Sequence, residues 1–193
     1  MPLSGNEIFV DCGAYTGDTA ALLLQAMERR SIDFTGEIFA FEPDAHNFAK
    51  LAGRASRLTN CRCFHKGVWD AAGILKYCNS VRGTDSFVVS VAAEPIHDNS
   101  FEKVEIEVVS LDEMLHGKAI TFIKMDVEGS ELPALRGAKQ IMAAYRPKLA
   151  VCIYHKKEDV IDIPQYIHSI RPDYDLYVRS HARDFSELVL YAV

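Results

Sequence analysis

A glycine-containing turn between a β-forming segment and a helix-forming segment constrains this sequence more than any other feature. Residues 7–10 are mostly apolar β-formers, whereas residues 20–27 are helix formers over a helical length. In the intervening segment VDCGAYTGDT at 10–19, Gly13 and Gly17 can adopt positive φ and let a ligand approach bare backbone. The first N–H groups of the helix favour an anionic group there. The pattern therefore predicts a strand, a turn and a helix that together bind a small molecule.

The spacing of this turn separates it from two common nucleotide-binding motifs. It contains G-x-x-x-G, whereas dinucleotide-binding turns contain G-x-G-x-x-G and P-loops contain G-x-x-x-x-G-K-[ST]. Asp11 stands two positions before the first glycine, and no lysine or arginine lies between Asp11 and Gln25. A polyphosphate would find little countercharge here. A ligand that carries a cationic group, an ammonium and a carboxylate fits better, because Asp11 can pair with the cation and the helix N-terminus with the carboxylate.

A second candidate ligand group follows the next predicted strand. The apolar segment 38–41 precedes Glu42, and the segment 45–57 has helical composition. A carboxylate at the end of the second strand of such a unit can accept two hydrogen bonds from a ribose diol. The alternative is a solvated acid that opens a helix, where carboxylates are favoured in any case. We favour the ribose ligand, because the glycine turn lies one strand earlier.

Length and composition predict one domain over residues 1–193. The chain is 49% hydrophobic and 25% charged, and it is long enough to bury a core without disulfides or metal. The net charge of −6 and the lack of a basic block disfavour nucleic acid as a partner. The sequence has neither a leader-like N-terminus nor an apolar run near the roughly 18 residues of a membrane span. We therefore expect a cytoplasmic protein with no membrane partner.

The five cysteines are odd in number and lack C-x-x-C spacing, which favours free thiols in a reducing compartment. Cys61 and Cys63 would share one face of a strand, but no second Cys or His pair stands at zinc-site spacing. We therefore predict no metal site built from these thiols.

The rest of the chain alternates between predicted strands and predicted helices. Further strands are expected at 61–65, 120–126 and 148–154, and helices are expected at 130–145 and 158–170. This order favours an α/β fold with a parallel sheet and right-handed crossovers. Ligands bind such open sheets at the carboxyl ends of the strands, where the strand order reverses.

Other segments depart from this alternation. Residues 66–69 are expected to form a turn and residues 74–78 a strand, while residues 103–109 form a strand outside the main parallel set. The final segments 176–179 and 188–191 are too close for a helical crossover, so they should pair antiparallel. The sheet is therefore expected to be parallel except for one reversed strand. The side chains expected at or just beyond the strand ends are Asp11, Glu42, His65, Asp126 and His155.

Charged residues close the predicted strand at 120–126. Lys124, Asp126 and Glu128 alternate along it, so all three can face one side. One interpretation is structural, with Glu128 or Ser130 capping the next helix and Lys124 in an ion pair. The other is that Asp126 meets the ligand or substrate, or that Asp126 and Glu128 hold a divalent ion.

Histidines supply further candidates. His155 follows another strand and can take a proton from a hydroxyl acceptor, although a histidine at a strand end is as often structural. His181, in the loop before the last strand, is the second choice. His65, Lys66 and Trp69 either frame an adenine by stacking and backbone contacts or form a plain strand end with an aromatic lid on the core.

With these motifs in view, the chain resembles the FkbM family of S-adenosylmethionine-dependent methyltransferases. The matching stretches span nearly the whole chain and are VDCGAYTGDT at 10–19, FAFEPD at 39–44, VSLDEML at 109–115, FIKMDVEGSELPALRGA at 122–138, and the closing YHKKEDVIDIP and ELVLYAV. The D-V-E-G-x-E segment combined with the F-E-P run is more specific than the glycine turn alone. The resemblance implies a Rossmann-like class I methyltransferase fold, a mostly parallel seven-stranded sheet with a reversed C-terminal strand and helices on both faces.

The resemblance also implies a cofactor, a site and a reaction. The methionine part of S-adenosylmethionine would lie around Asp11, Gly13 and Gly17, with its ribose on Glu42. The reaction implied is O-methylation of a hydroxyl on a small-molecule acceptor such as a sugar or natural product, for example a glycoside or polyketide. The candidate cofactor-binding residues are Asp11, Gly13, Ala14, Tyr15, Gly17, Asp18, Thr19, Glu42, Pro43, His65, Lys66, Gly67 and Asp126, and the catalytic candidates are His155, Asp126 and Glu128.

Two other functions are compatible with the motifs. An NAD-type oxidoreductase would share the sheet and the ribose acid, although the glycine turn counts against it. A catalytically silent S-adenosylmethionine-binding protein would keep the pocket. Only six residues precede the first predicted strand, whereas methyltransferases of this broad class commonly carry N-terminal helices over the cofactor. We hypothesise that residues 70–102, or a second subunit in a homodimer, close the site.

Overall fold

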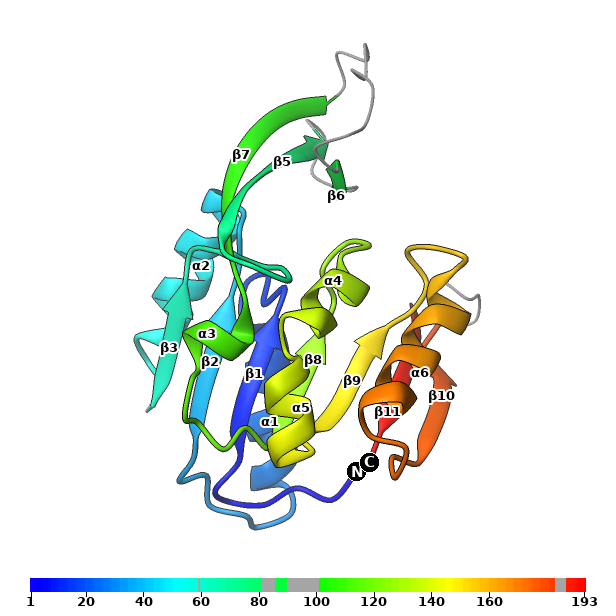
Figure 1. Cartoon of the computed structure of the whole chain (residues 1–193). Helices are drawn as coiled ribbons and strands as arrows, with labels where there is room; N and C mark the ends of the chain where they lie inside the picture. Colours follow the sequence, from blue (N-terminus) through cyan, green and yellow to red (C-terminus); the bar gives the residue numbers. More distant parts are fainter. Residues whose placement is uncertain (59, 81–85, 90–100, 183–186) are drawn as a thin grey trace.

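The centre of the molecule is a seven-stranded sheet (Figure 1). The computed structural model describes residues 1–58, 60–80, 86–89, 101–182 and 187–193. The strand order is β10-β11-β9-β8-β1-β2-β3, and every neighbouring pair is parallel except that β11 runs antiparallel to both β9 and β10. The prediction of a mostly parallel sheet with a reversed C-terminal strand is confirmed. The strands are β1 (Ile8–Cys12), β2 (Glu37–Phe41), β3 (Cys61–Phe64), β8 (Phe122–Met125), β9 (Lys148–Cys152), β10 (Leu176–Ser180) and β11 (Leu188–Ala192).

Helices cover both faces of this sheet, because side chains alternate between the two faces along each strand. On one face, Phe9 of β1 packs against buried residues of the first helix, and the second helix covers the neighbouring strands. On the other face, Val10 and Cys12 belong to a larger core with the remaining helices. The first face carries α1 (Asp18–Glu28) and α2 (Ala45–Ala55), and the second carries α3 (Leu111–Met114), α4 (Glu131–Arg136), α5 (Lys139–Tyr145) and α6 (Asp159–Ile170).

The single helix predicted at 130–145 is wrong in extent, because the structure has two helices there. A Cβ on Gly137 would lie 2.0 Å from the carbonyl oxygen of Trp69, so the chain passes close to another backbone segment at this point. Asp112 fixes the break. Its N–H donates to the Gly137 carbonyl (2.8 Å), and its carboxylate accepts two backbone N–H bonds from the first turn of α5 (2.9 Å each). A distant side chain therefore caps α5 and separates it from α4.

A second sheet of four strands stands over the ends of β1, β2 and β8 (Figure 1). Its order is β4 (Gly67–Val68), β7 (Phe101–Val109), β5 (Gly73–Ser80) and β6 (Ser86–Val89). The expected strand at 103–109 thus lies outside the main parallel set, as predicted. The turn predicted at 66–69 is wrong, because β4 there pairs in parallel with the end of β7. Of the segment 70–102 expected to cover the site, residues 81–85 and 90–100 lie outside the described residues.

The strand order reverses between β1 and β8. From β1 the chain continues to β2 and β3 on one side, whereas β8, β9 and the C-terminal strands lie on the other. In open α/β sheets, the carboxyl ends of the strands at such a reversal form a crevice for ligands. The glycine turn after β1 and the acidic segment after β8 both lie at this point.

The four cysteines whose side chains are described, Cys12, Cys61, Cys63 and Cys152, are free thiols. Across the described ranges, no helix has the length and apolar character needed to traverse a lipid bilayer.

Candidate functional site

A cavity of about 590 Å³ opens at the strand-order reversal. Its floor is formed by the residues that follow β1, β2 and β8, and its far wall is apolar and comes from the second sheet. The volume lies within the range of roughly 300–1,000 Å³ typical of small-molecule sites. The predicted site residues that line the cavity are Gly13, Tyr15, Asp18, Thr19, Glu42, Pro43, Lys66, Gly67, Asp126 and Glu128.

Five of the predicted site residues do not line this cavity. Asp11 and Ala14 are fully buried beneath it, and Gly17 forms the N-cap of α1. His65 is exposed and stacks on the ring of Phe48, with centroids 4.8 Å apart. His155 lies behind Asp126 and Glu128, which do line it. These five residues therefore lie beneath or beside the cavity and do not line it.

The glycine turn is held by backbone contacts that require glycine. Gly13 has φ +73°, and a Cβ at this position would lie 1.8 Å from the carbonyl oxygen of Asp126. The N–H groups of Gly13 and Ala14 both donate to the Phe41 carbonyl at the end of β2 (3.0 and 2.9 Å). The turn is therefore fixed against the ends of β2 and β8. Positive φ continues at Tyr15 (φ +49°), so its N–H faces back toward β2.

Asp11 lies beneath this turn and forms an ion pair with Lys124. It lies opposite Lys124 in the register of β1 and β8, with Oδ1 3.3 Å from Nζ. Burial raises the pKa of Asp11, and Lys124 offsets this only in part. Lys124 also donates to the carbonyl of Gly13 (2.7 Å). The pair thus joins β1 to β8 under the turn, and Asp11 already has a cationic partner within the protein.

Glu42 is 6% exposed and presents its carboxylate at the cavity. Oε2 accepts the N–H of Tyr15 (2.8 Å) and Oε1 accepts the N–H of Asp44 (2.9 Å). Burial raises the pKa of Glu42 to about 7, although both backbone hydrogen bonds act in the opposite direction. Each carboxylate oxygen keeps a second acceptor site, so the group can still accept two donors from a ligand.

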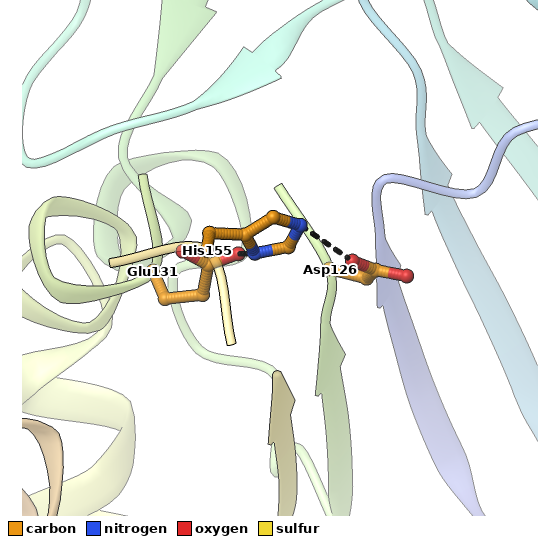
Figure 2. A group of neighbouring side chains, drawn as sticks. All are labelled: Asp126, Glu131 and His155. Atoms are coloured by element: carbon orange, nitrogen blue, oxygen red, sulfur yellow. Dashed lines mark ion pairs between the residues drawn. The ribbon is translucent and has the colours of Figure 1, made fainter. Parts of the chain in front are cut away.

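A group of acidic side chains and one histidine lies at the other end of the cavity floor (Figure 2). His155 lies between Glu131 on one side and Asp126 on the other. Its Nδ1 is 2.9 Å from Glu131 Oε1, and its Nε2 is 3.5 Å from both Asp126 Oδ1 and Glu128 Oε2. Tyr154 donates its hydroxyl to Asp126 Oδ1 (3.1 Å). Asp126 and Glu128 both line the cavity, but β8 ends at Met125 and Glu128 has φ +55°, so a turn and not the predicted strand alternation brings Glu128 there.

This arrangement changes what His155 can do. Burial lowers the pKa of His155, but the hydrogen bond to Glu131 and the charges of Glu131, Glu128 and Asp126 outweigh it and raise the pKa above its usual value. A protonated imidazole cannot accept a proton. Asp126, whose side chain is 33% exposed, lines the cavity together with Glu128 and can accept a proton there.

The remaining sequence candidates lie apart from this cluster. Lys66 lines the cavity and forms an ion pair with Glu107 of β7. His181 has its Nε2 2.7 Å from the Tyr191 hydroxyl and does not line the cavity. Ser130 is the N-cap residue of α4 but makes no side-chain cap bond. The Lys124 ion pair, one of the structural roles considered for the 124–130 segment, is observed with Asp11.

Several lining residues escaped the sequence analysis. His46, Asn47 and Lys50 of α2 contribute one wall. Their spacing of three and four residues places them on one helix face, and that signal was present in the sequence. Ile106 and Val108 of β7 contribute to the apolar wall. They alternate with charged residues in the sequence, and this alternation indicates one apolar strand face.

Comparison with known proteins identifies the fold and the family. A family model described as the methyltransferase FkbM domain matches residues 11–176. The crystal structure of the methyltransferase FkbM from Methylobacillus flagellatus KT superposes with a TM-score of 0.77 at 29% identity, covering 100% of this chain. This chain spans 45% of the length of that protein. A search of curated protein sequences found no match.

More distant structures share the fold. Fibrillarin from Aeropyrum pernix, solved with natively bound S-adenosyl-L-methionine, matches 100% of this chain and 70% of its own, with a TM-score of 0.54 at 13% identity. An rRNA methylase from Streptococcus thermophilus matches 98% of this chain and 88% of its own, with a TM-score of 0.55 at 15% identity. The main sheet therefore has the architecture of class I methyltransferases.

Proposed function

The chain belongs to the family of FkbM-domain methyltransferases, and we propose that it transfers the methyl group of S-adenosylmethionine to a hydroxyl oxygen of a small acceptor. The observation that carries this proposal is the Glu42 carboxylate, buried beside the glycine turn where the strand order reverses. Because the M. flagellatus protein is more than twice as long, the acceptor and the activity of the whole protein are part of the proposal.

The donor fits the floor of the cavity in one orientation. Glu42 accepts the two ribose hydroxyls, and the N-terminus of α1 faces the carboxylate of the methionine part. Asp18 lines the cavity at the start of α1 and can pair with the ammonium, a role for which Asp11 is too deeply buried. The donor is then anchored at both ends, with its sulfonium toward β8.

The acceptor lies between Asp126 and the apolar wall. Methyl transfer forms a bond from the acceptor oxygen to the methyl carbon while the carbon–sulfur bond breaks, and the cofactor leaves as neutral-sulfur S-adenosylhomocysteine. Asp126 takes the hydroxyl proton, with His155 and Tyr154 holding its carboxylate in place. The wall formed by Trp69, Leu75 and Ile106 suits the apolar face of a glycoside or polyketide.

Titration calorimetry tests the donor assignment. S-adenosylmethionine and S-adenosylhomocysteine are expected to saturate one site, whereas NAD is expected to give no binding heat. The opposite result would favour the oxidoreductase. If both sulfur compounds bind but no methyl donor is consumed across a panel of glycosides and polyketides, a silent binding protein becomes the better description.

The raised pKa of Glu42 predicts how binding depends on pH. The ribose hydroxyls need the ionised carboxylate, so affinity is full well above pH 7 and is lost as the pH falls through 7. Raising the pH from 6 to 8 should tighten S-adenosylhomocysteine binding about tenfold, and binding at pH 6 should release about one proton. Calorimetry in buffers of different ionisation enthalpy counts that proton. Glu42→Gln should bind more weakly and release none. Equal proton release by both proteins would show that another group titrates.

A further inference from the structure

We infer that the cluster after β8 binds a divalent transition-metal ion, with His155 Nε2, Asp126 and Glu128 as ligands and Glu131 as the partner that orients His155. Asp126, Glu131 and His155 each place a side-chain nitrogen or oxygen atom within 4.8 Å of the other two. Figure 2 shows the imidazole between the two carboxylates, with Nδ1 toward Glu131 and Nε2 toward Asp126. The two ring nitrogens therefore face different partners, which assigns them different roles.

The distances separate a hydrogen bond from a metal site. Nδ1 is 2.9 Å from Glu131 Oε1, which is an ordinary hydrogen-bond length. Nε2 is 3.5 Å from both Asp126 Oδ1 and Glu128 Oε2, which is longer than a good N–H···O bond. Two donors each about 2.1 Å from one ion lie roughly 3.0–3.4 Å apart. The distance from Nε2 to each of these two carboxylate oxygens thus suits an ion between them.

Neighbouring side chains hold His155 and Asp126 in the way that hydrogen-bond partners hold the ligands of known metal sites. A ligating histidine commonly donates its other N–H to a carboxylate, and ligating carboxylates are themselves hydrogen-bonded. Glu131 is fully buried, and Oε1 also accepts the N–H of Val127 (2.9 Å), so it is fixed where it meets Nδ1. Within the described part of the chain, the other oxygen of this buried carboxylate, Oε2, has no hydrogen-bond partner. Tyr154 supports Asp126 in the same way.

The donor set indicates the class of ion. One imidazole and two carboxylates suit Mn²⁺ or Zn²⁺ better than Ca²⁺ or Mg²⁺, which prefer oxygen ligands alone. Asp126 and Glu128 line the cavity, so an ion held there has open positions on the acceptor side. The role of the ion rests on the proposed methyl transfer. The ion would bind the acceptor hydroxyl and lower the pKa of that hydroxyl. Asp126 would bind the ion through one carboxylate oxygen and take the hydroxyl proton on the other.

Metal binding is tested directly on the full chain, without an acceptor. After removal of metals with a chelator, Mn²⁺ is titrated by calorimetry and by the loss of its free-ion EPR signal, with Zn²⁺ in parallel. We expect one site, with pulsed EPR showing a coordinated imidazole nitrogen. Glu128→Gln and His155→Ala should each weaken Mn²⁺ binding at least tenfold, and Glu131→Gln should weaken it roughly 10- to 100-fold. His168→Ala, at an exposed histidine of α6, is the matched control and should bind as the parent does.

The outcomes are distinct from those of the donor experiment. Glu128 is 45% exposed, so its replacement keeps the test valid even if His155→Ala fails to fold. Mn²⁺ binding that is equally strong in Glu128→Gln and His155→Ala, or that lacks a nitrogen signal, would overturn the metal site. If S-adenosylhomocysteine binds and Mn²⁺ does not, only this inference fails. If Mn²⁺ binds and S-adenosylhomocysteine does not, the donor assignment fails instead.

Discussion

Replacing Gly13 with alanine is expected to destabilise the fold by about 3 kcal/mol or more, because both the backbone angle and the space at this position exclude a side chain. The added Cβ would lie 1.8 Å from the Asp126 carbonyl oxygen and 2.9 Å from the carbonyl carbon. To avoid this clash, the turn must move away from β8, and that movement also breaks the hydrogen bond from Lys124 to the Gly13 carbonyl. Urea unfolding followed by circular dichroism measures the loss.

Two other glycines separate the contributions to this effect. Gly117 has φ +76° with nothing within 4 Å of an added Cβ, so Gly117→Ala measures the cost of the backbone angle alone, roughly 1 kcal/mol. Gly53 lies inside α2 with the same open space and no positive φ, so Gly53→Ala should stabilise the protein by about 0.5–1 kcal/mol. Equal destabilisation by Gly13→Ala and Gly117→Ala would show that the contact with Asp126 is unimportant.

Asp126→Asn is expected to lower turnover on the accepted hydroxyl substrate by about 10²- to 10⁴-fold, the usual contribution of a positioned acid–base group. The amide keeps the size of the side chain and can accept the Tyr154 hydroxyl, so the local structure should persist. The Kd of the donor should change by no more than about tenfold, the value of one hydrogen bond, because Glu42 and the glycine turn supply the other contacts.

Asp162→Asn provides the comparison for this variant. Asp162 is an exposed carboxylate in the first turn of α6 and does not line the cavity, so its replacement should leave kcat unchanged. Turnover of Asp126→Asn within threefold of the parent would remove Asp126 from the reaction. A parallel loss of donor affinity and turnover would show instead that the residue mainly binds the cofactor.

Features encoded by neighbouring residues could be predicted from the sequence. The glycine turn and Glu42 each depend on a strand followed at once by a turn or helix, and both lie at the cavity or directly beneath it. The antiparallel pairing of β10 with β11 followed from the short chain between them. In each case the relevant spacing is a few residues, so periodicity and turn composition carry the information.

Features that depend on distant partners could not be predicted in the same way. β4 is two residues long and exists because it pairs with β7, which lies far along the chain. The break between α4 and α5 depends on Asp112 and on the backbone at Trp69. The pairing of Asp11 with Lys124 depends on the register of β1 with β8. The contact of Glu131 with His155 depends on where the start of α4 lies relative to the end of β9. Single-sequence patterns do not contain these distances.

The hydrogen bond from the Trp69 N–H to the Val109 carbonyl (2.9 Å) closes the base of the second sheet. Residues 67–69 and 108–109 therefore lie side by side, so the segment between them can change in length or sequence without displacing β1, β2 or β8. The apolar wall of the cavity is thus a separable part of the fold. Exchanging the segment between Trp69 and Val109 among related enzymes should change which acceptor is preferred. The proposed ribose-binding site at Glu42 should stay the same.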